Sequence, residues 1–201
     1  MKFAGIALVL AVAFWAGGCG DDSSTDSLHY VLVIDTLPVV EDARIQSDVP
    51  DGQYGAAAEL VVVKVVYSGG YTVEYRSLVK LPSLPDSVAI GSLERATLIL
   101  HYTGQDSSRA VPVAVYAVDS AWSEASVSWN MKPAASDVSF ANGLVARKLL
   151  RVGVWGIYHA GTGSRGIMLA TNDGTEQGFH SSEAPDPKLR PAVEYAYRVR
   201  R

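Results

Sequence analysis

Two tryptophans, Trp122 and Trp129, stand seven residues apart in a segment (residues 119–130) of otherwise small and polar residues. An indole ring can do two things there: stack on the apolar face of a sugar ring, or bury on the order of 200 Å² against a core. Residues 126–129 alternate polar and larger apolar side chains, as a short strand does. We expect both rings to be packed, so that they fix one long connection onto a β-rich core.

Three other aromatic residues are better candidates for contacts with a ligand, because they stand near predicted loops. Tyr71 follows a Ser-Gly-Gly turn, and Trp155 and Tyr158 shortly precede a glycine-rich loop. We expect these three rings to be exposed, where a flat aromatic surface would stack on a sugar.

That loop, residues 161–166, has the spacing G-x-G-x-x-G, which binds dinucleotides only when a strand precedes it and a helix follows it. Here residues 167–170, Ile-Met-Leu-Ala, are typical of a strand. We therefore interpret 161–166 as a hairpin loop. Ser164 is not in a nucleophile elbow either, because Thr162 occupies a position where that motif needs glycine.

Titratable residues form no catalytic or zinc-binding pattern along the chain. Four scattered histidines lack a cysteine partner with which to build a zinc site: His29, His101, His159 and His180. Carboxylates such as Glu124 and Glu183 are numerous, but a glycosidase acid pair is defined by a distance in space. We expect a protein that is not an enzyme.

The elements that would position these residues are predicted to be strands. Residues 59–67 and 71–81 are β-prone runs joined by a glycine turn, which predicts a hairpin. The last strand alternates clearly, with Val193, Tyr195, Tyr197 and Val199 facing one way. Residues 144–157 are ambiguous, because Leu149, Val152 and Trp155 have a partly helical spacing. Short strands separated by turns predict an all-β fold, an antiparallel β-sandwich of jelly-roll type with few or no helices.

Cys19 is the only cysteine, and the residues before it predict an exported protein. Residues 3–15 are an apolar run of the length of a signal peptide's hydrophobic region, too short for a permanent membrane span. Ala16-Gly17-Gly18 before Cys19 resembles the lipobox of bacterial lipoproteins, which implies cleavage after residue 18 and acylation of Cys19. The alternative is an ordinary secretory signal with an incidental cysteine.

These features divide the chain into a lipoprotein signal peptide (1–18), a lipidated cysteine with a polar tether (19–27) and one domain (28–201). Two or three acyl chains hold a protein firmly on a membrane. The expected location is the bacterial cell envelope. In a cell with two membranes, Gly20 directly after Cys19 resembles the sorting signal for the outer membrane.

The overall charge argues against a nucleic-acid partner. The formal net charge is −4, and the chain that remains after residue 18 has 16 basic and 21 acidic residues. Nucleic acids are bound by a basic face, which this composition does not supply.

Several motifs resemble, in order, those of DNRLRE domains, also classed as carbohydrate-binding module family 96. The clearest is Trp122, Glu124, Trp129 and Asn130 followed by Pro133. Others are Tyr54-Gly55, residues 76–81 with Leu84-Pro85, residues 96–100, Val115-Tyr116, residues 179–183 and Arg190-Pro191. The resemblance covers roughly residues 42–199 and implies a β-sandwich fold and polysaccharide as the class of ligand. It also implies a strand followed by a short helix within residues 144–157.

The acidic residues Asp42 and Glu183 are candidates for a structural calcium site at the edge of the sandwich, as other carbohydrate-binding sandwiches often have. Glu183 is otherwise expected to accept a backbone hydrogen bond or to pair with Arg190. No other cofactor is expected.

Together these observations predict a lipid-anchored, non-catalytic β-sandwich that binds polysaccharide or acts in adhesion. One alternative is an envelope lipoprotein that docks another protein, which an extended apolar patch near residues 31–40 would favour. The other is a small polysaccharide-active enzyme. Residues 28–40 have no assigned role and are either an extra edge strand or a swapped arm.

Overall fold

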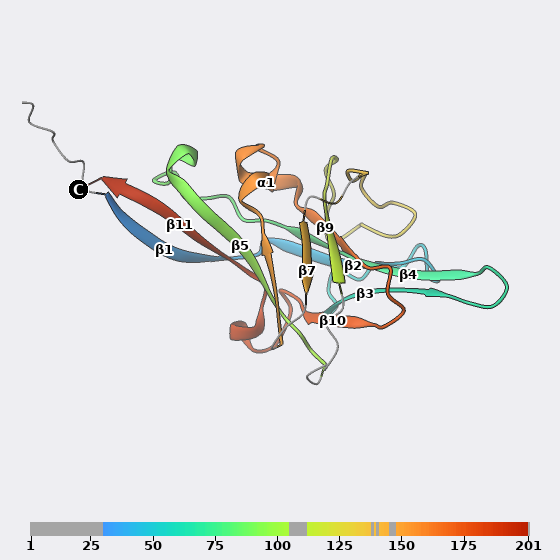
Figure 1. Cartoon of the computed structure of the whole chain (residues 1–201). Coiled ribbons are helices and arrows are strands. Elements are labelled where there is room, and N and C mark those ends of the chain that lie inside the picture. Colours follow the sequence, from blue (N-terminus) through green and yellow to red (C-terminus); the bar gives the residue numbers. More distant parts are fainter. Residues whose placement is uncertain (1–29, 105–111, 138, 140, 145–147, 201) are drawn as a thin grey trace, which may run out of the picture.

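The computed structural model of the chain describes residues 30–104, 112–137, 139, 141–144 and 148–200. Within these residues the strands form two sheets that pack face to face, and every pairing between neighbouring strands is antiparallel (Figure 1). This arrangement confirms the predicted all-β sandwich.

The smaller sheet has four strands in the order β1 (Tyr30–Pro38), β11 (Ala192–Arg200), β5 (Leu93–His101) and β8 (Leu149–Gly153). The larger sheet has the order β10 (Gln177–His180), β3 (Glu59–Val66), β4 (Thr72–Lys80), β9 (Ile167–Ala170), β6 (Pro112–Ala117) and β7 (Ala141–Leu144). A further strand, β2 (Glu41–Gln46), pairs with β4.

The main core lies between the two sheets and is made of aliphatic side chains that alternate along the strands. Leu98 and Val193 from the smaller sheet are fully buried with Val62, Val79 and Leu169 from the larger sheet. Side chains at the intervening positions face outward, because successive residues of a strand point to opposite faces. The outer face of the larger sheet is therefore free to carry polar residues.

The last strand follows its predicted alternation only where it crosses the body of the molecule. Val193 and Tyr195 are buried, whereas Tyr197 is half-buried and Val199 is 39% exposed. β1 and β11 run beyond the body as a two-stranded ribbon, so the distal residues have no second sheet to pack on (Figure 1).

The predicted hairpin of residues 59–81 is confirmed as β3 and β4, which pair from Val63↔Tyr75 to Val66↔Thr72. Its turn is closed by the Tyr67 amide, which donates to the Tyr71 carbonyl over 2.8 Å. The hairpin projects at the end of the molecule opposite to the β1–β11 ribbon (Figure 1).

Two local predictions are wrong. Residues 126–129 are not a strand: the Ser126 and Val127 amides donate to the Ser123 carbonyl in a turn, and in the part of the chain that the structure describes no strand pairs with these residues. Residues 161–166 are not a hairpin loop, because they join the short helix α1 (Trp155–His159) to β9 through a 3-10 turn, Gly163–Arg165. The strand and short helix expected within 144–157 are present as β8 and α1.

Helices are few and short in the described part of the chain. Besides α1 there are three single 3-10 turns, Ile90–Ser92, Gly163–Arg165 and Pro187–Leu189. None of the helices described is long and apolar enough to cross a membrane.

Candidate functional site

A groove of about 400 Å³ is open on the outer face of the larger sheet. Its floor is formed by small or flexible side chains of β6 and β9, namely Ala114, Met168 and Ala170. Because alanine leaves space where a larger side chain would stand, these positions make the sheet surface hollow. Residues 132–137 of the β6–β7 connection form one wall.

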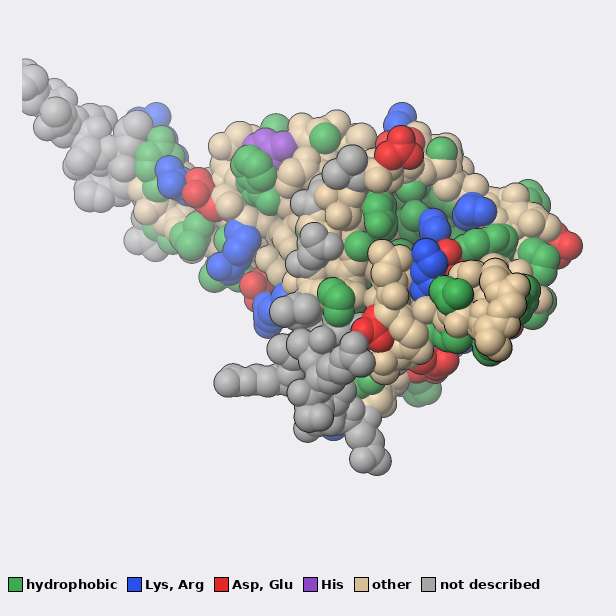
Figure 2. Space-filling model, turned by 45° about the vertical axis from the view of Figure 1, so that its right-hand side comes forward, with side chains coloured by type: hydrophobic (Ala, Val, Ile, Leu, Met, Phe, Trp, Pro, Cys, Tyr) green, Lys and Arg blue, Asp and Glu red, His purple; other side chains and the backbone are tan. Residues whose placement is uncertain are grey.

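Cationic side chains from distant parts of the sequence meet in this groove. Lys64 of β3 and Arg76 of β4 project from the sheet, and Lys132 comes from the connection. Figure 2 shows Lys and Arg side chains gathered beside apolar ones on the right-hand half of the molecule. Two acidic residues, Glu74 and Asp137, also line the groove, so its cations outnumber its carboxylates by three to two.

Arg76 and Lys64 are held in place by polar side chains that also line the groove. Arg76 Nε donates to Glu74 Oε1 over 2.7 Å, and both side chains are largely buried. Lys64 Nζ donates to Asn172 Oδ1 over 3.3 Å. Lys132 is exposed, and its Nζ donates to the Trp129 carbonyl over 3.1 Å.

Trp129 supports the cations of the groove. Its ring lies 5.3 Å from Arg76 Cζ and 4.5 Å from Lys132 Nζ, both within the range of cation–π attraction. The indole is half-buried and packs on a second hydrophobic cluster that includes Ile45, Leu78 and Val127. Cations therefore lie over a ring that would otherwise be available to stack on a sugar.

Asn130, the next residue of the motif, anchors the connection. Its backbone amide donates to the Pro50 carbonyl over 3.0 Å, and its side-chain Nδ2 donates to Asp51 Oδ1 over 2.9 Å. These bonds tie the connection to the turn around residue 51. Because residues 132–137 of the same connection form the wall of the groove, the bonds made by Asn130 also hold that wall in place.

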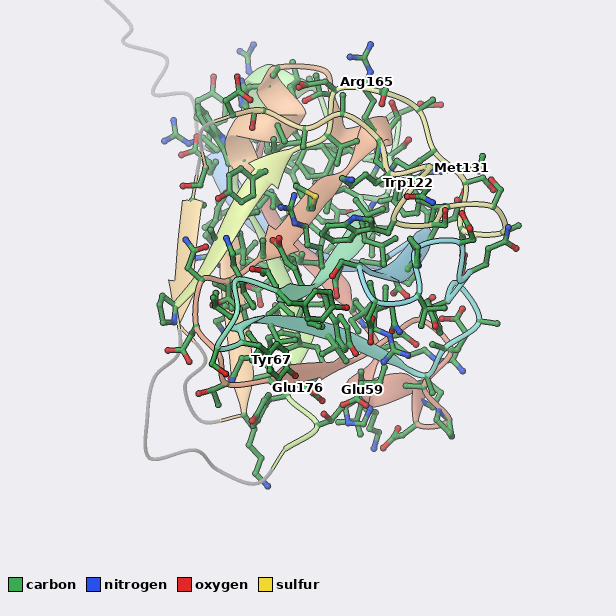
Figure 3. All side chains as sticks on the ribbon, turned by 90° about the vertical axis from the view of Figure 1, so that its right-hand side faces the viewer. Glu59, Tyr67, Trp122, Met131, Arg165 and Glu176 are labelled. Atoms are coloured by element: carbon green, nitrogen blue, oxygen red, sulfur yellow. The ribbon has the colours of Figure 1, made fainter. Side chains whose placement is uncertain are left out.

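Trp122 has a comparable structural position. Its Nε1 donates to the Arg165 carbonyl over 2.8 Å, and Lys80 Nζ lies 4.8 Å from its ring centre (Figure 3). The ring is half-buried against the same second cluster as Trp129. The structure therefore places both tryptophans of the motif as supports for the long β6–β7 connection.

The three aromatic residues expected to be exposed lie outside the groove. Tyr71 is 59% exposed at the tip of the β3–β4 hairpin, and Trp155 is 44% exposed on α1. The prediction for Tyr158 is wrong: this ring is buried in the main core, and its hydroxyl donates to the Pro82 carbonyl over 2.8 Å. Tyr158 faces inward because α1 turns its apolar side, including Ile157, toward the core.

Three carboxylate side chains, those of Asp42, Glu124 and Glu183, lie close together in a group that we call the carboxylate cluster. Asp42 is completely buried; its Oδ2 accepts from the Ser182 amide over 2.8 Å, and its Oδ1 has no hydrogen-bond partner. Burial is the largest cause that raises the pKa of Asp42 to about 7, and the nearby charges of Glu183 and Glu124 act in the same direction. An unpaired buried carboxylate oxygen is unfavourable.

Glu124 and Glu183 contribute the rest of this carboxylate cluster. Burial, followed by the charge of Glu183 and a hydrogen bond with it, raises the pKa of Glu124 to about 7. Glu183 Oε1 also accepts from the Ser182 hydroxyl over 2.8 Å. The Nε of Arg190, its predicted partner, donates to the Ala184 carbonyl instead.

Glu41 and Lys80 border the carboxylate cluster. Partial burial pushes the pKa of Glu41 upward, but hydrogen bonds from Lys80 and the Glu124 amide together with the charge of Lys80 outweigh it, so the pKa lies below its ordinary value. The distance from Lys80 Nζ to Glu41 Oε1 is 2.8 Å. Glu41, Glu124 and Gly55 also line a shallow pocket of about 450 Å³.

The carboxylate cluster has some of the properties of a metal site. The orphaned Asp42 oxygen and the two raised pKa values fit a place where a cation would relieve repulsion between carboxylates. Among the residues that the structure describes, however, no three His, Cys, Asp or Glu side chains are arranged to hold a metal ion. The calcium prediction for Asp42 and Glu183 therefore stays a prediction, with Glu124 added as a neighbour.

The sequence singled out neither Lys64, Arg76 nor Lys132 as site residues. The available signal was that Lys64 and Arg76 interrupt apolar strands at outward-facing positions. That signal does not show which of the outward-facing cations lie close together in space. The other residues that line the groove come from β6, β9 and the β6–β7 connection, which are distant in sequence.

The three cations of the groove and the motif residues that support it lie on a segment that also matches a known family. A comparison with curated proteins gives no match. The family model for carbohydrate-binding module family 96 matches residues 33–148, which include β2 to β7 and the whole β6–β7 connection. The match covers more than half of the 201 residues and starts nine residues before Asp42, where the motif resemblance begins. The chain therefore belongs to carbohydrate-binding module family 96.

Proposed function

We propose that this protein is a lipid-anchored, non-catalytic module of the bacterial cell envelope that binds polysaccharide in the groove on the larger sheet. The observation that carries the proposal is the convergence of Lys64, Arg76 and Lys132 over a floor of small residues. The family supports carbohydrate as the class of ligand.

The size and chemistry of the groove suit a sugar chain. A volume of about 400 Å³ lies within the range of ligand sites, roughly 300–1,000 Å³. Ammonium and guanidinium groups donate charge-assisted hydrogen bonds to hydroxyl and carboxylate oxygens, and these bonds are about twice as strong as neutral ones. The excess of cations over carboxylates favours a polysaccharide with acidic units.

The test is a binding screen of residues 28–201 against neutral and acidic polysaccharides. Lys132→Ala removes an exposed donor from the groove, and Lys188→Ala, also exposed but on the 3-10 turn Pro187–Leu189, is the matched control. Loss of one charge-assisted hydrogen bond of about 1.5 kcal/mol weakens affinity roughly tenfold.

We expect this loss for Lys132→Ala and unchanged affinity for Lys188→Ala, measured by calorimetry. Trp155→Ala should also bind normally, because Trp155 lies on α1 outside the groove. Equal losses in all three variants, or a loss only in Trp155→Ala, would remove the groove from consideration.

The lipid anchor is the second part of the proposal and rests on Cys19 and the residues before it. In bacterial cells fed an alkyne-labelled fatty acid, the wild-type chain should become labelled and fractionate with the outer membrane of a two-membrane cell. Cys19→Ser should lose the label. Labelling of the Cys19→Ser chain would show that another position is acylated.

A structural calcium ion is the third part of the proposal, held by Asp42 and Glu183. The unpaired Asp42 oxygen and the crowding of carboxylates around it support this site. Added calcium should raise the melting temperature of the wild-type chain and leave that of Asp42→Asn unchanged. A response that is equal in the two proteins would place the ion elsewhere.

One observation favours the alternative of a protein-docking lipoprotein. Leu32, Ile34 and Val40 are 55%, 56% and 56% exposed along the segment that was predicted to carry such a patch. A specific envelope protein recovered with the wild-type chain but not with Ile34→Ser, together with no polysaccharide binding, would establish this alternative.

A further inference from the structure

The free end of the β1–β11 ribbon carries apolar side chains where a solvated strand would carry polar ones. We define the ribbon tip as residues 30–34 of β1 and 197–200 of β11. Tyr30, Leu32 and Ile34 alternate along one face and are 51%, 55% and 56% exposed. Monomeric proteins seldom place three large apolar side chains side by side in water.

The opposite face of the ribbon tip is apolar as well. Val31 pairs with Val199, and Val33 pairs with Tyr197. Val199 is 39% exposed and the other three side chains are half-buried. A sheet with one core face and one solvated face alternates apolar and polar residues, whereas both faces of this ribbon carry large apolar side chains.

Basic residues stand beside Tyr30 and Leu32 on the first face of the ribbon tip. Arg200 is the pairing partner of Tyr30, and Arg198 is the partner of Leu32. Arg198 Nε donates to Glu94 Oε1 over 2.9 Å, and its side chain is still 55% exposed. Arginine and tyrosine beside exposed aliphatic residues are the combination found at the boundary between lipid headgroups and acyl chains.

The ribbon tip also lies where a lipid anchor would hold it. The described chain begins at Tyr30, which is 11 residues after Cys19, so the two are at most about 40 Å apart along an extended chain. An anchor at Cys19 therefore keeps the ribbon tip near the membrane surface, with the β3–β4 hairpin at the far end (Figure 1).

We propose that the ribbon tip inserts into the interfacial layer of the membrane to which the protein is anchored. This inference rests on the proposed acylation of Cys19. The acyl chains supply attachment, and Leu32, Ile34 and Tyr30 supply a second contact that orients the molecule. The groove then lies at a distance from the lipid, because two of its strands form the hairpin at the opposite end.

The test measures the depth of a single probe in the bilayer. The full chain is produced in bacteria, purified from membranes, and reconstituted into phosphatidylcholine and phosphatidylglycerol vesicles with brominated acyl chains. Ile34→Trp places a probe in the ribbon tip, and Val66→Trp places one at the opposite end of the molecule. Both positions are exposed strand sites, 56% and 67%, so neither variant disturbs the core.

A probe that inserts about 5–10 Å below the headgroups is reached by bromine. The fluorescence of the unsubstituted chain, which has tryptophans of its own, is subtracted from that of each variant. Bromine should then quench the Ile34→Trp probe at least about twice as strongly as the Val66→Trp probe. The emission of the Ile34→Trp probe should also shift to the blue.

The possible outcomes distinguish insertion of the ribbon tip from membrane attachment through Cys19. Vesicle-bound protein with equal quenching at the two probes would overturn insertion while leaving the anchor intact. Protein that stays out of the vesicles, like Cys19→Ser, would overturn both. A blue shift at the Ile34→Trp probe without quenching, accompanied by cross-linked dimers, would assign the ribbon tip to a second copy of the chain.

Discussion

The buried carboxyl group of Asp42 makes the stability of the calcium-free protein depend on pH. Burial raises its pKa from 3.8 to about 7, so the folded state binds a proton more tightly than the unfolded state. Because the folded pKa is the higher one, the folded protein loses stability as pH rises from about 4 to about 7, and the loss is complete above that interval.

We expect the free energy of unfolding in the presence of a chelator to be lower at pH 8 than at pH 5. The contribution of Asp42 is on the order of 2–4 kcal/mol, and Asp42→Asn should largely abolish this part of the difference. Urea denaturation at the two pH values measures it. A wild-type protein that is more stable at pH 8 than at pH 5 would show that Asp42 is ionised and stabilised in the fold.

Trp122 is expected to contribute to stability, whereas Tyr71 is not. The indole of Trp122 packs on the second hydrophobic cluster, and its Nε1 donates to the Arg165 carbonyl. Trp122→Ala should lower the free energy of unfolding by about 2–4 kcal/mol, as for other large-to-small changes. Tyr71→Ala, at the exposed tip of the hairpin, should change it by about 0.5 kcal/mol or less. Urea midpoints for the two variants decide between these roles, and equal effects would contradict them.

Among the elements, the junction before β9 depends on a glycine. Gly166 has φ +80°, and a Cβ there would overlap the Val79 carbonyl of the adjacent β4. Gly70 has a similar φ of +83° in the β3–β4 turn, where the same Cβ would meet open space. The two positions therefore share a positive φ and differ in the steric contact that a Cβ would make.

Gly70→Ala should lower the free energy of unfolding by about 1 kcal/mol, through backbone strain alone. Gly166→Ala should lower it by about 3 kcal/mol or more, because β9 must also move away from β4. Thermal unfolding of both variants measures the difference. Equal losses would mean that the β4–β9 junction adapts freely.

For the molecule as a whole, the distribution of charge is expected to matter more than its sum. The chain has a formal net charge of −4, which would repel an acidic polysaccharide at long range. The groove nevertheless gathers three cations, and only its local field would attract such a ligand.

Affinity for an acidic polysaccharide should therefore fall about tenfold or more between roughly 0.05 and 0.5 M salt, because salt screens exposed charges. Affinity for a neutral polysaccharide should change little. Calorimetric titrations at both salt concentrations test this, and salt-independent binding of an acidic ligand would exclude Lys64 and Lys132 as its main contacts.

The class of fold follows from the sequence alone, because strand alternation and glycine turns are local properties. The β3–β4 hairpin follows from two β-prone runs and a glycine turn, and the family resemblance implies the strand and short helix that are present as β8 and α1. The ordered motifs also resemble the family whose model matches residues 33–148. Each of these features depends on residues that are close together in the chain or in a fixed order.

Which side chains meet depends on how the strands and loops pack in three dimensions. The groove combines Lys64, Arg76 and Lys132 from two strands and a loop, and the carboxylate cluster combines residues 42, 124 and 183. Tyr158 was expected at the surface, but packing of α1 on the core buries it. Residues 126–129 alternate like a strand and form none, because the Ser126 and Val127 amides donate to the Ser123 carbonyl within a turn. The groove, the carboxylate cluster and the burial of Tyr158 depend on contacts between distant segments, which local patterns do not specify.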